Sequence, residues 1–182
     1  GSEPTSFGTL LEDAYYVQVD DDYVYVATGL NHCTIYRAPK SGGELEELAS
    51  SESIHLALTR DGNTIPEMEI HDGKLYWANQ YHNGHGLGTI AAIPLDGGPI
   101  EELAVRQNSP QDLVFHDGDM FWINGGDTWK SNGELMRLES GATEAEILVS
   151  GLRRPEYLQV DDDYIYVTAY DAEMDGFDFD IG

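Results

Sequence analysis

The sequence predicts an all-β protein, a β-propeller with four blades of about 45 residues and four strands each. Two observations predict this fold. One segment recurs four times along the 182-residue chain, and a second segment recurs three times between those copies. Within each copy, β-type alternation is interrupted by residues typical of tight turns. Repeats at fixed periods of about 20–50 residues indicate a solenoid, a propeller or an array.

The first segment carries an apolar residue, a short acidic or Asp-Gly turn, and then an aromatic, β-branched run. Its apolar residue falls at Val19, Ile70, Phe115 and Val160, which gives spacings of 51, 45 and 45 residues. The copies read YVQVDDDYVYVAT (16–28), EMEIHDGKLYWAN (67–79), DLVFHDGDMFWIN (112–124) and YLQVDDDYIYVTA (157–169). The second segment reads TIYRAPKSGGELEELA (34–49), TIAAIPLDGGPIEELA (89–104) and ELMRLESGATEAEILV (134–149).

Each element of one unit follows from these letters. Val-Gln-Val and Met-Glu-Ile alternate with period two and predict the innermost strand. Asp-Asp-Asp and His-Asp-Gly then supply turn residues, because Asp and Gly tolerate the backbone angles of a hairpin. The runs YVYVAT and LYWAN predict a second strand, GTIAAIP a third, and IEELA a fourth after the turn LDGG. No segment shows a sustained helical period.

These residues carry a resemblance to a known family. The sequence resembles the YWTD/NHL-like bacterial β-propeller repeats, since LYWAN, MFWIN, YVYVAT and YIYVTA stand where that family has its YWTD tetrad. Pro110 and Pro155 stand five residues before Phe115 and Val160, like the leading proline of the family pattern. The resemblance implies a propeller fold. Every copy departs from the strict tetrad, so it implies little about function.

The expected organisation is a single propeller domain over residues 1–182. Its blade repeats cover approximately 14–50, 65–105, 110–150 and 155–182, with an additional N-terminal strand at 8–13. We expect that strand to complete the last blade beside 177–181 and to close a four-bladed ring. The alternative is part of a larger or dimeric propeller, in which an open half exposes apolar surface and associates with a second copy. The expected state is thus a monomer if the ring closes and a homodimer if it does not.

Composition excludes some partners. Nine Lys and Arg face thirty-four Asp and Glu, for a net charge of −25. Such a surface repels phosphate backbones, so nucleic acid is not expected as a partner. No apolar run approaches the ~18 residues of a membrane span, so membrane insertion is not expected. Cys33 is the single cysteine, which excludes an internal disulfide. The acidity favours a secreted, periplasmic or cell-surface location in a bacterium.

The long loops at one end of the blades are the predicted binding face, because propeller function usually lies in loops on a rigid scaffold. Trp129, with Tyr81 and Tyr170, is a candidate aromatic platform for a sugar or peptide. His71 and His116 are interpreted as turn residues on the opposite face. The candidate ligand-binding residues are His32, His82, Asn83, His85, Arg106, Asp127, Trp129 and Arg153.

Two cation sites are further hypotheses. His82 and His85, with His32 or an Asp, could bind a transition metal through imidazole nitrogens. Asp171, Glu173 and Asp175 have the spacing of oxygen ligands at the start of a calcium loop, although position 12 is Gly182 instead of Glu. Calcium is the cofactor that this acidic spacing suggests.

The function favoured by the sequence is a binding scaffold for a protein or carbohydrate ligand on the long-loop face. One alternative is an enzyme of hydrolase or lyase type with its active site at the mouth of the central channel. His32, His82, His85 and Arg106 would then be the first residues to test. Another is a structural part-propeller that associates with itself. No nucleophile elbow or phosphate loop supports catalysis.

Overall fold

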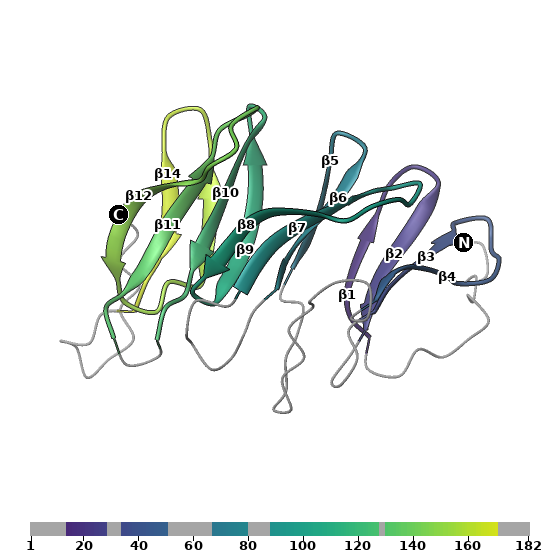
Figure 1. Ribbon diagram of the computed structural model, residues 1–182, viewed down its shortest axis with the longest axis horizontal. Helices are drawn as coiled ribbons and strands as arrows, with labels where there is room; N and C mark the ends of the chain where they lie inside the picture. Colours follow the sequence, from purple (N-terminus) through teal and green to yellow (C-terminus); the bar gives the residue numbers. More distant parts are fainter. Residues whose placement is uncertain (1–13, 29–33, 51–66, 80–87, 128–129, 171–182) are drawn as a thin grey trace, which may run out of the picture.

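The computed structural model describes residues 14–28, 34–50, 67–79, 88–127 and 130–170. These residues form fourteen strands and no helix, so nothing in this part of the chain offers a helix that could cross a membrane. The strands form antiparallel sheets in which chain order is also spatial order (Figure 1). The all-β prediction is confirmed.

Each sheet comes from one copy of the repeat, and we call the sheets the first to fourth blades. The first blade contains β1 (Ala14–Val19), β2 (Tyr23–Thr28), β3 (Thr34–Pro39) and β4 (Glu46–Ser50). The second contains β5 (Met68–His71), β6 (Lys74–Asn79), β7 (Gly88–Pro94) and β8 (Glu101–Gln107). The third contains β9 (Pro110–His116), β10 (Asp119–Asn124), β11 (Gly133–Leu138) and β12 (Glu146–Leu152). The described part of the fourth contains β13 (Tyr157–Val160) and β14 (Ile165–Thr168).

The turns between the first two strands of each blade lie together at the upper end of the molecule in Figure 1. Two of them are built on an aspartate. Asp20 Oδ1 accepts hydrogen bonds from the backbone N–H groups of Asp22 (2.8 Å) and Tyr23 (2.6 Å), and Asp161 repeats this pattern in the fourth blade. The other two use an Asp-Gly pair with positive φ at both residues, as in a type I′ hairpin turn.

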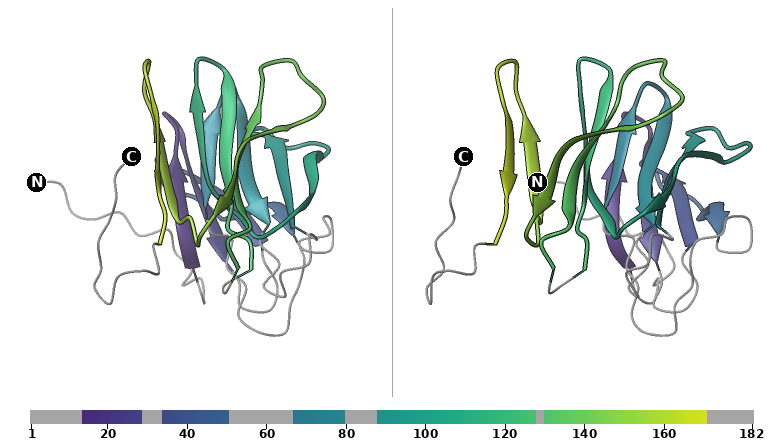
Figure 2. Two further views of the ribbon diagram at one scale, coloured as in Figure 1. Left: turned by 90° about the vertical axis from the view of Figure 1, so that its left-hand side faces the viewer. Right: turned by 60° about the vertical axis from the view of Figure 1, so that its left-hand side comes forward.

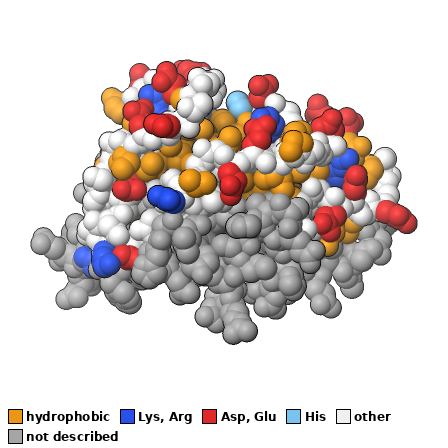
Figure 3. Space-filling model, viewed as in Figure 1, with side chains coloured by type: hydrophobic (Ala, Val, Ile, Leu, Met, Phe, Trp, Pro, Cys, Tyr) orange, Lys and Arg blue, Asp and Glu red, His pale blue; other side chains and the backbone are white. Residues whose placement is uncertain are grey.

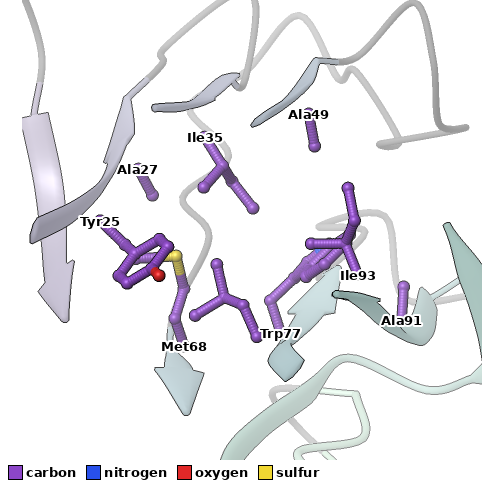
Figure 4. Close-up of a cluster of buried hydrophobic side chains, with 9 residues drawn as sticks. Tyr25, Ala27, Ile35, Ala49, Met68, Trp77, Ala91 and Ile93 are labelled. Atoms are coloured by element: carbon purple, nitrogen blue, oxygen red, sulfur yellow. The ribbon is translucent and has the colours of Figure 1, made fainter. Parts of the chain in front are cut away.

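Alternation along the innermost strands assigns their side chains to two faces. The second and fourth residues of each repeat copy face the preceding blade, and the first and third face the following blade. Buried clusters accordingly fill the spaces between the first and second, second and third, and third and fourth blades. Figure 4 shows the first of these, where Tyr25 and Ile35 meet Met68 and Trp77.

A glycine at the start of a third strand sets the distance between consecutive blades. A Cβ atom on Gly133 would lie 2.6 Å from Cδ of Pro155 and 2.9 Å from the carbonyl oxygen of Leu152. Gly88 repeats this arrangement against Pro110. Both prolines are fully buried. The leading proline of the repeat therefore inserts against the preceding blade, and only glycine leaves room for it.

The blades stand in chain order in a row, with the first and fourth at opposite ends (Figures 1 and 2). This radial stacking of four-stranded meanders is a β-propeller arrangement, as predicted. The described residues of the first and fourth blades share no buried cluster. The expected pairing of residues 8–13 with 177–181 lies outside the described residues, so closure of the ring stays a prediction.

Candidate functional site at the innermost strands

The first residue of each repeat copy lies where an innermost strand begins. These residues are Tyr16, Glu67, Asp112 and Tyr157. Strand pairing places them at the end of the blades where β2, β6 and β10 finish, since Tyr16 pairs with Ala27 and Met68 with Trp77. This is the end opposite the short turns. Because the innermost strands of consecutive blades are neighbours, the repeat brings equivalent positions together.

Three of the four residues form a continuous hydrogen-bonded row across three blades. The Tyr16 hydroxyl donates to Glu67 Oε1 at 3.0 Å. The carboxyl groups of Glu67 and Asp112 share a hydrogen bond. Asp112 Oδ2 in turn accepts the backbone N–H of Leu158 in the fourth blade. The row links the blades through polar groups at a place where their apolar clusters end.

The row changes the acidity of its members. The pKa of Glu67 is raised from 4.5 to about 7, first by burial and then by the hydrogen bond and negative charge of Asp112, while the Tyr16 hydroxyl lowers it by less. Burial also raises the pKa of Asp112, against the opposing effect of the hydrogen bonds from Glu67 and Leu158. The pKa of Tyr16 lies above its usual range because of burial and the Glu67 charge. The Glu67 carboxyl therefore binds a proton below neutral pH, next to Asp112.

Neighbouring amides fix the backbone around this row. Gln18 donates through Nε2 to the carbonyl oxygen of Met68 at 2.7 Å, which joins the first and second blades. Gln111 donates to the carbonyl oxygen of Pro155 at 2.6 Å, which joins the third and fourth. Asp112 has a φ of 49°, a left-handed conformation that is uncommon for residues other than glycine.

A cavity of about 250 Å³ opens beside the row. Its described lining contains three carboxylates, one amide and one phenol: Glu67, Gln111, Asp112, Glu156 and Tyr157. This lining repels anions and offers acceptors to hydroxyl or amine groups. Among the residues that the structure describes, no three His, Cys, Asp or Glu side chains are grouped closely enough to hold a metal ion. Figure 3 shows acidic side chains also along the short-turn end.

Most of the residues proposed from the sequence lie outside the part of the chain that the structure describes. His32, His82, Asn83, His85 and Trp129 lie outside the described residues, as do Asp171, Glu173 and Asp175 of the calcium hypothesis. Four of the proposed residues are described, among them Tyr170 of the aromatic platform, whose partner Tyr81 lies outside the described residues. None of the four is among the described residues that line the cavity. Their positions are as follows: Asp127 accepts hydrogen bonds from Lys130 and Asn132 within its own loop, Arg106 is exposed in β8, and the carbonyl oxygen of Arg153 accepts the N–H of Tyr170.

His71 and His116 lie at the short-turn end, as predicted, and each directly precedes the Asp-Gly pair of its turn. They are the last residues of β5 and β9. The ring of His71 stacks on Phe115 of the next blade, with centroids 4.1 Å apart and planes at 5°. Nε2 of His116 lies 3.5 Å from Asp162 of the fourth blade. Both side chains therefore bridge consecutive blades at the short-turn end.

Comparison with known proteins supports the fold. No family model matches the sequence, and no curated protein matches it. The computationally designed Ika4 protein matches with a TM-score of 0.57 and 14% identity over 93% of this chain and 92% of that one. A putative TolB from Agrobacterium tumefaciens matches with a TM-score of 0.51 and 11% identity over 90% of this chain. An α-L-arabinofuranosidase from Clostridium thermocellum matches with a TM-score of 0.51 and 14% identity over 85%.

These structural neighbours are β-propeller proteins, and identities this low establish the fold alone. The chain spans 59% of the TolB chain and 59% of the arabinofuranosidase chain. The comparisons agree with a propeller repeat, while nothing in them assigns the chain to the YWTD/NHL group.

Proposed function

We propose that the protein is a ligand-binding β-propeller and that a small saccharide occupies the cavity beside Glu67 and Asp112. The observation that carries this proposal is the lining of the cavity, in which acids, an amide and a phenol converge from consecutive blades. A cavity of about 250 Å³ lies near the lower limit of ~300 Å³ for ligand pockets. Its size therefore favours a ligand no larger than one or two sugar rings.

The chemistry of the lining matches saccharide hydroxyls. Carboxylates accept hydrogen bonds from hydroxyl groups, and Gln111 and Tyr157 add groups that both donate and accept. The Tyr157 side chain is 65% exposed at the edge of the cavity, where its ring can stack on the apolar face of a sugar. The net charge of −25 disfavours phosphorylated or acidic sugars. Neutral saccharides remain as the best-matched class.

The spacing of Glu67 and Asp112 does not fit the paired carboxylates of a glycoside hydrolase, although one structural neighbour is an arabinofuranosidase. A glycosidase needs two carboxyl groups on opposite sides of the scissile bond, about 5–9.5 Å apart. Glu67 and Asp112 are hydrogen-bonded to each other, which leaves no space for a glycosidic bond between them. Binding without cleavage is therefore the function that this pair supports.

The test is saturation-transfer NMR with L-arabinose, D-galactose and D-glucose, each added to about 10 mM so that a millimolar Kd would be detected. We expect transfer to at least one sugar in the unmodified chain. Asp112→Asn and Tyr157→Ala should each reduce that signal several-fold, because they alter an acceptor and the stacking ring. Putrescine is included as a cationic probe.

Two matched variants control this experiment. Glu102→Gln removes an exposed acid from β8, and Tyr36→Ala removes a partly exposed tyrosine of β3 that does not line the cavity. Both should leave the sugar signal unchanged. No transfer to any sugar would overturn the proposal, and so would transfer to putrescine alone or a loss that is equal in the control variants.

For the location, we propose a secreted or periplasmic protein. The acidic surface supports this choice, and fractionation of the native organism with an antibody against the chain tests it. Recovery in the cytoplasmic fraction would contradict it.

A further inference from the structure

The first blade has a face without a neighbour among the described residues. Val17 is the second residue of its repeat copy, and it is 59% exposed. The equivalent residues in the other three blades are Met68, Leu113 and Leu158, which are 0%, 3% and 1% exposed. Val19, two residues further along β1, is 53% exposed on the same face. In the other three blades, the second residue of the copy is buried against the preceding blade. Among the described residues, no blade precedes the first one, so Val17 has no such contact.

The fourth blade has the complementary face uncovered. Its segment 157–163 repeats the sequence of 16–22 with one change, Leu for Val at the second position. In the first blade, Tyr16 and Gln18 bond to the second blade through Glu67 and the carbonyl oxygen of Met68. Their copies in the fourth blade, Tyr157 and Gln159, are exposed. The fourth blade thus carries the groups of an inter-blade contact on a face that no described blade covers.

Tyr164 adds apolar area to this second face. It is 66% exposed, whereas its equivalent in the first blade, Tyr23, packs against the buried cluster between the first and second blades. The two uncovered faces belong to opposite ends of the row of blades in Figure 1. They are also the two halves of the contact that the repeat makes three times within the chain.

We propose that a second copy of this chain covers both faces, with the fourth blade of each copy packed against the first blade of the other. The contact is head-to-tail, and two such contacts related by a two-fold axis along the propeller axis close one ring. A second copy is the occupant because it presents both complementary faces of this repeat at once. Val17 and Val19 of one copy then meet Tyr164 and Gln159 of its partner in the manner of Met68 against Tyr16 and Gln18.

This inference shares Tyr157 with the proposed saccharide site, but its tests measure mass and cross-linking, which do not require a bound sugar. Light scattering coupled to size exclusion, in salt sufficient to screen two chains of charge −25, gives the mass in solution. We expect twice 20.1 kDa, about 40 kDa. Val17→Asp and Tyr164→Asp should each halve that mass. Val105→Asp, at a 52% exposed residue of β8, should leave it unchanged.

Cysteine cross-linking determines which faces meet. In a Cys33→Ala background, Val17→Cys and Gln159→Cys are combined and oxidised, and circular dichroism confirms that the fold is retained. We expect a dimer on non-reducing gels, with a disulfide between positions 17 and 159 identified by mass spectrometry.

Each other outcome overturns the proposal. A monomer with an internal 17–159 disulfide would show a ring closed by one chain. A dimer linked 17 to 17 would show a face-to-face contact, and a ladder of larger species would show an open filament. A monomeric mass with no cross-link would show that the faces have no partner copy. None of these results depends on sugar binding.

Discussion

Replacing Glu67 by Gln should stabilise the protein at alkaline pH and leave its stability almost unchanged at acidic pH. Below neutral pH the Glu67 carboxyl is protonated and shares a hydrogen bond with Asp112. A Gln amide has the same shape as that protonated acid and can donate to Asp112 in its place. Above neutral pH, two adjacent carboxylates carry charge in the unmodified chain, and Gln removes one of them.

The magnitude follows from the pKa of Glu67. Its value in the fold is about 7 against an ordinary value of 4.5, a difference of about 2.5. At about 1.36 kcal/mol per pKa unit this corresponds to about 3.4 kcal/mol if the group were fully shielded. Glu67 is only half-buried, so solvent screening reduces the expected effect to about 1.5 kcal/mol.

The sign follows from proton linkage. The folded state binds a proton at Glu67 more tightly than the unfolded chain does, so the folded state holds more protons between pH 4.5 and about 7. The free energy of unfolding therefore falls as pH rises through this window. The whole penalty is present above about pH 7 and absent below the unfolded pKa. Glu67→Gln abolishes this part of the pH dependence.

Urea unfolding followed by tryptophan fluorescence measures the effect, because Trp77 and Trp122 are fully buried in the fold. The unfolding free energy of Glu67→Gln minus that of the unmodified chain should increase by about 1.5 kcal/mol from pH 5 to pH 8. Glu102→Gln controls for the loss of one charge from a chain of net charge −25, and its difference should stay within about 0.5 kcal/mol. A pH-independent difference for Glu67→Gln, or an equal one for Glu102→Gln, would refute the reasoning.

Two further predictions concern the blade framework. Gly133→Ala should lower the unfolding free energy by about 2–3 kcal/mol, because its Cβ would collide with the buried Pro155 ring. The control is Gly141→Ala, at a residue with φ of 79° and open space around it, which should cost only about 1 kcal/mol in urea unfolding. Equal losses in the two variants would contradict the packing argument. Asp20→Ala should cost about 1 kcal/mol of unfolding free energy at pH 7 in the same assay, and less in strong acid. Burial alone would raise the pKa of Asp20, but hydrogen bonds from the Tyr25 hydroxyl and two backbone N–H groups outweigh it and lower the pKa, so the stabilisation is lost as pH falls. A loss that does not change with pH would count against this account.

The fold was predictable because every blade of a propeller needs the same turns, strands and inter-blade contacts, so the residues that make them recur in each repeat. The Asp-rich and Asp-Gly turns, the alternating apolar positions and the leading proline each satisfy a local requirement that recurs around the axis. Pro110 and Pro155 show this clearly, since each needs a glycine at the start of a third strand. A turn or strand predicted in one copy can therefore be checked against the same segment in the other copies, and four copies would rarely agree by chance.

The candidate site was not predicted, because chemistry was sought in residues that are rare in this sequence. Histidines and basic side chains drew attention to the long loops, whereas the row at the innermost strands is built from Glu, Asp and Tyr, which are abundant. A usable signal existed in the repeat alignment. The first position of the four copies reads Tyr, Glu, Asp and Tyr. The aligned turns vary less, because they read Asp-Asp-Asp in two copies and His-Asp-Gly in the other two. The variation among polar residues at this position, which faces the following blade, was the signal of the site.

The same alignment gives a general way to judge exposed residues in a repeat protein. An exposed valine is ordinary on any surface and carries no argument by itself. Val17 differs because three equivalents in the same chain define what its surroundings should be, and all three are buried. Tyr157 and Gln159 differ for the same reason, since Tyr16 and Gln18 show the bonds that such residues make when a following blade is present. An internal repeat therefore supplies its own control, and the residues that break its pattern of burial are the ones that require a partner.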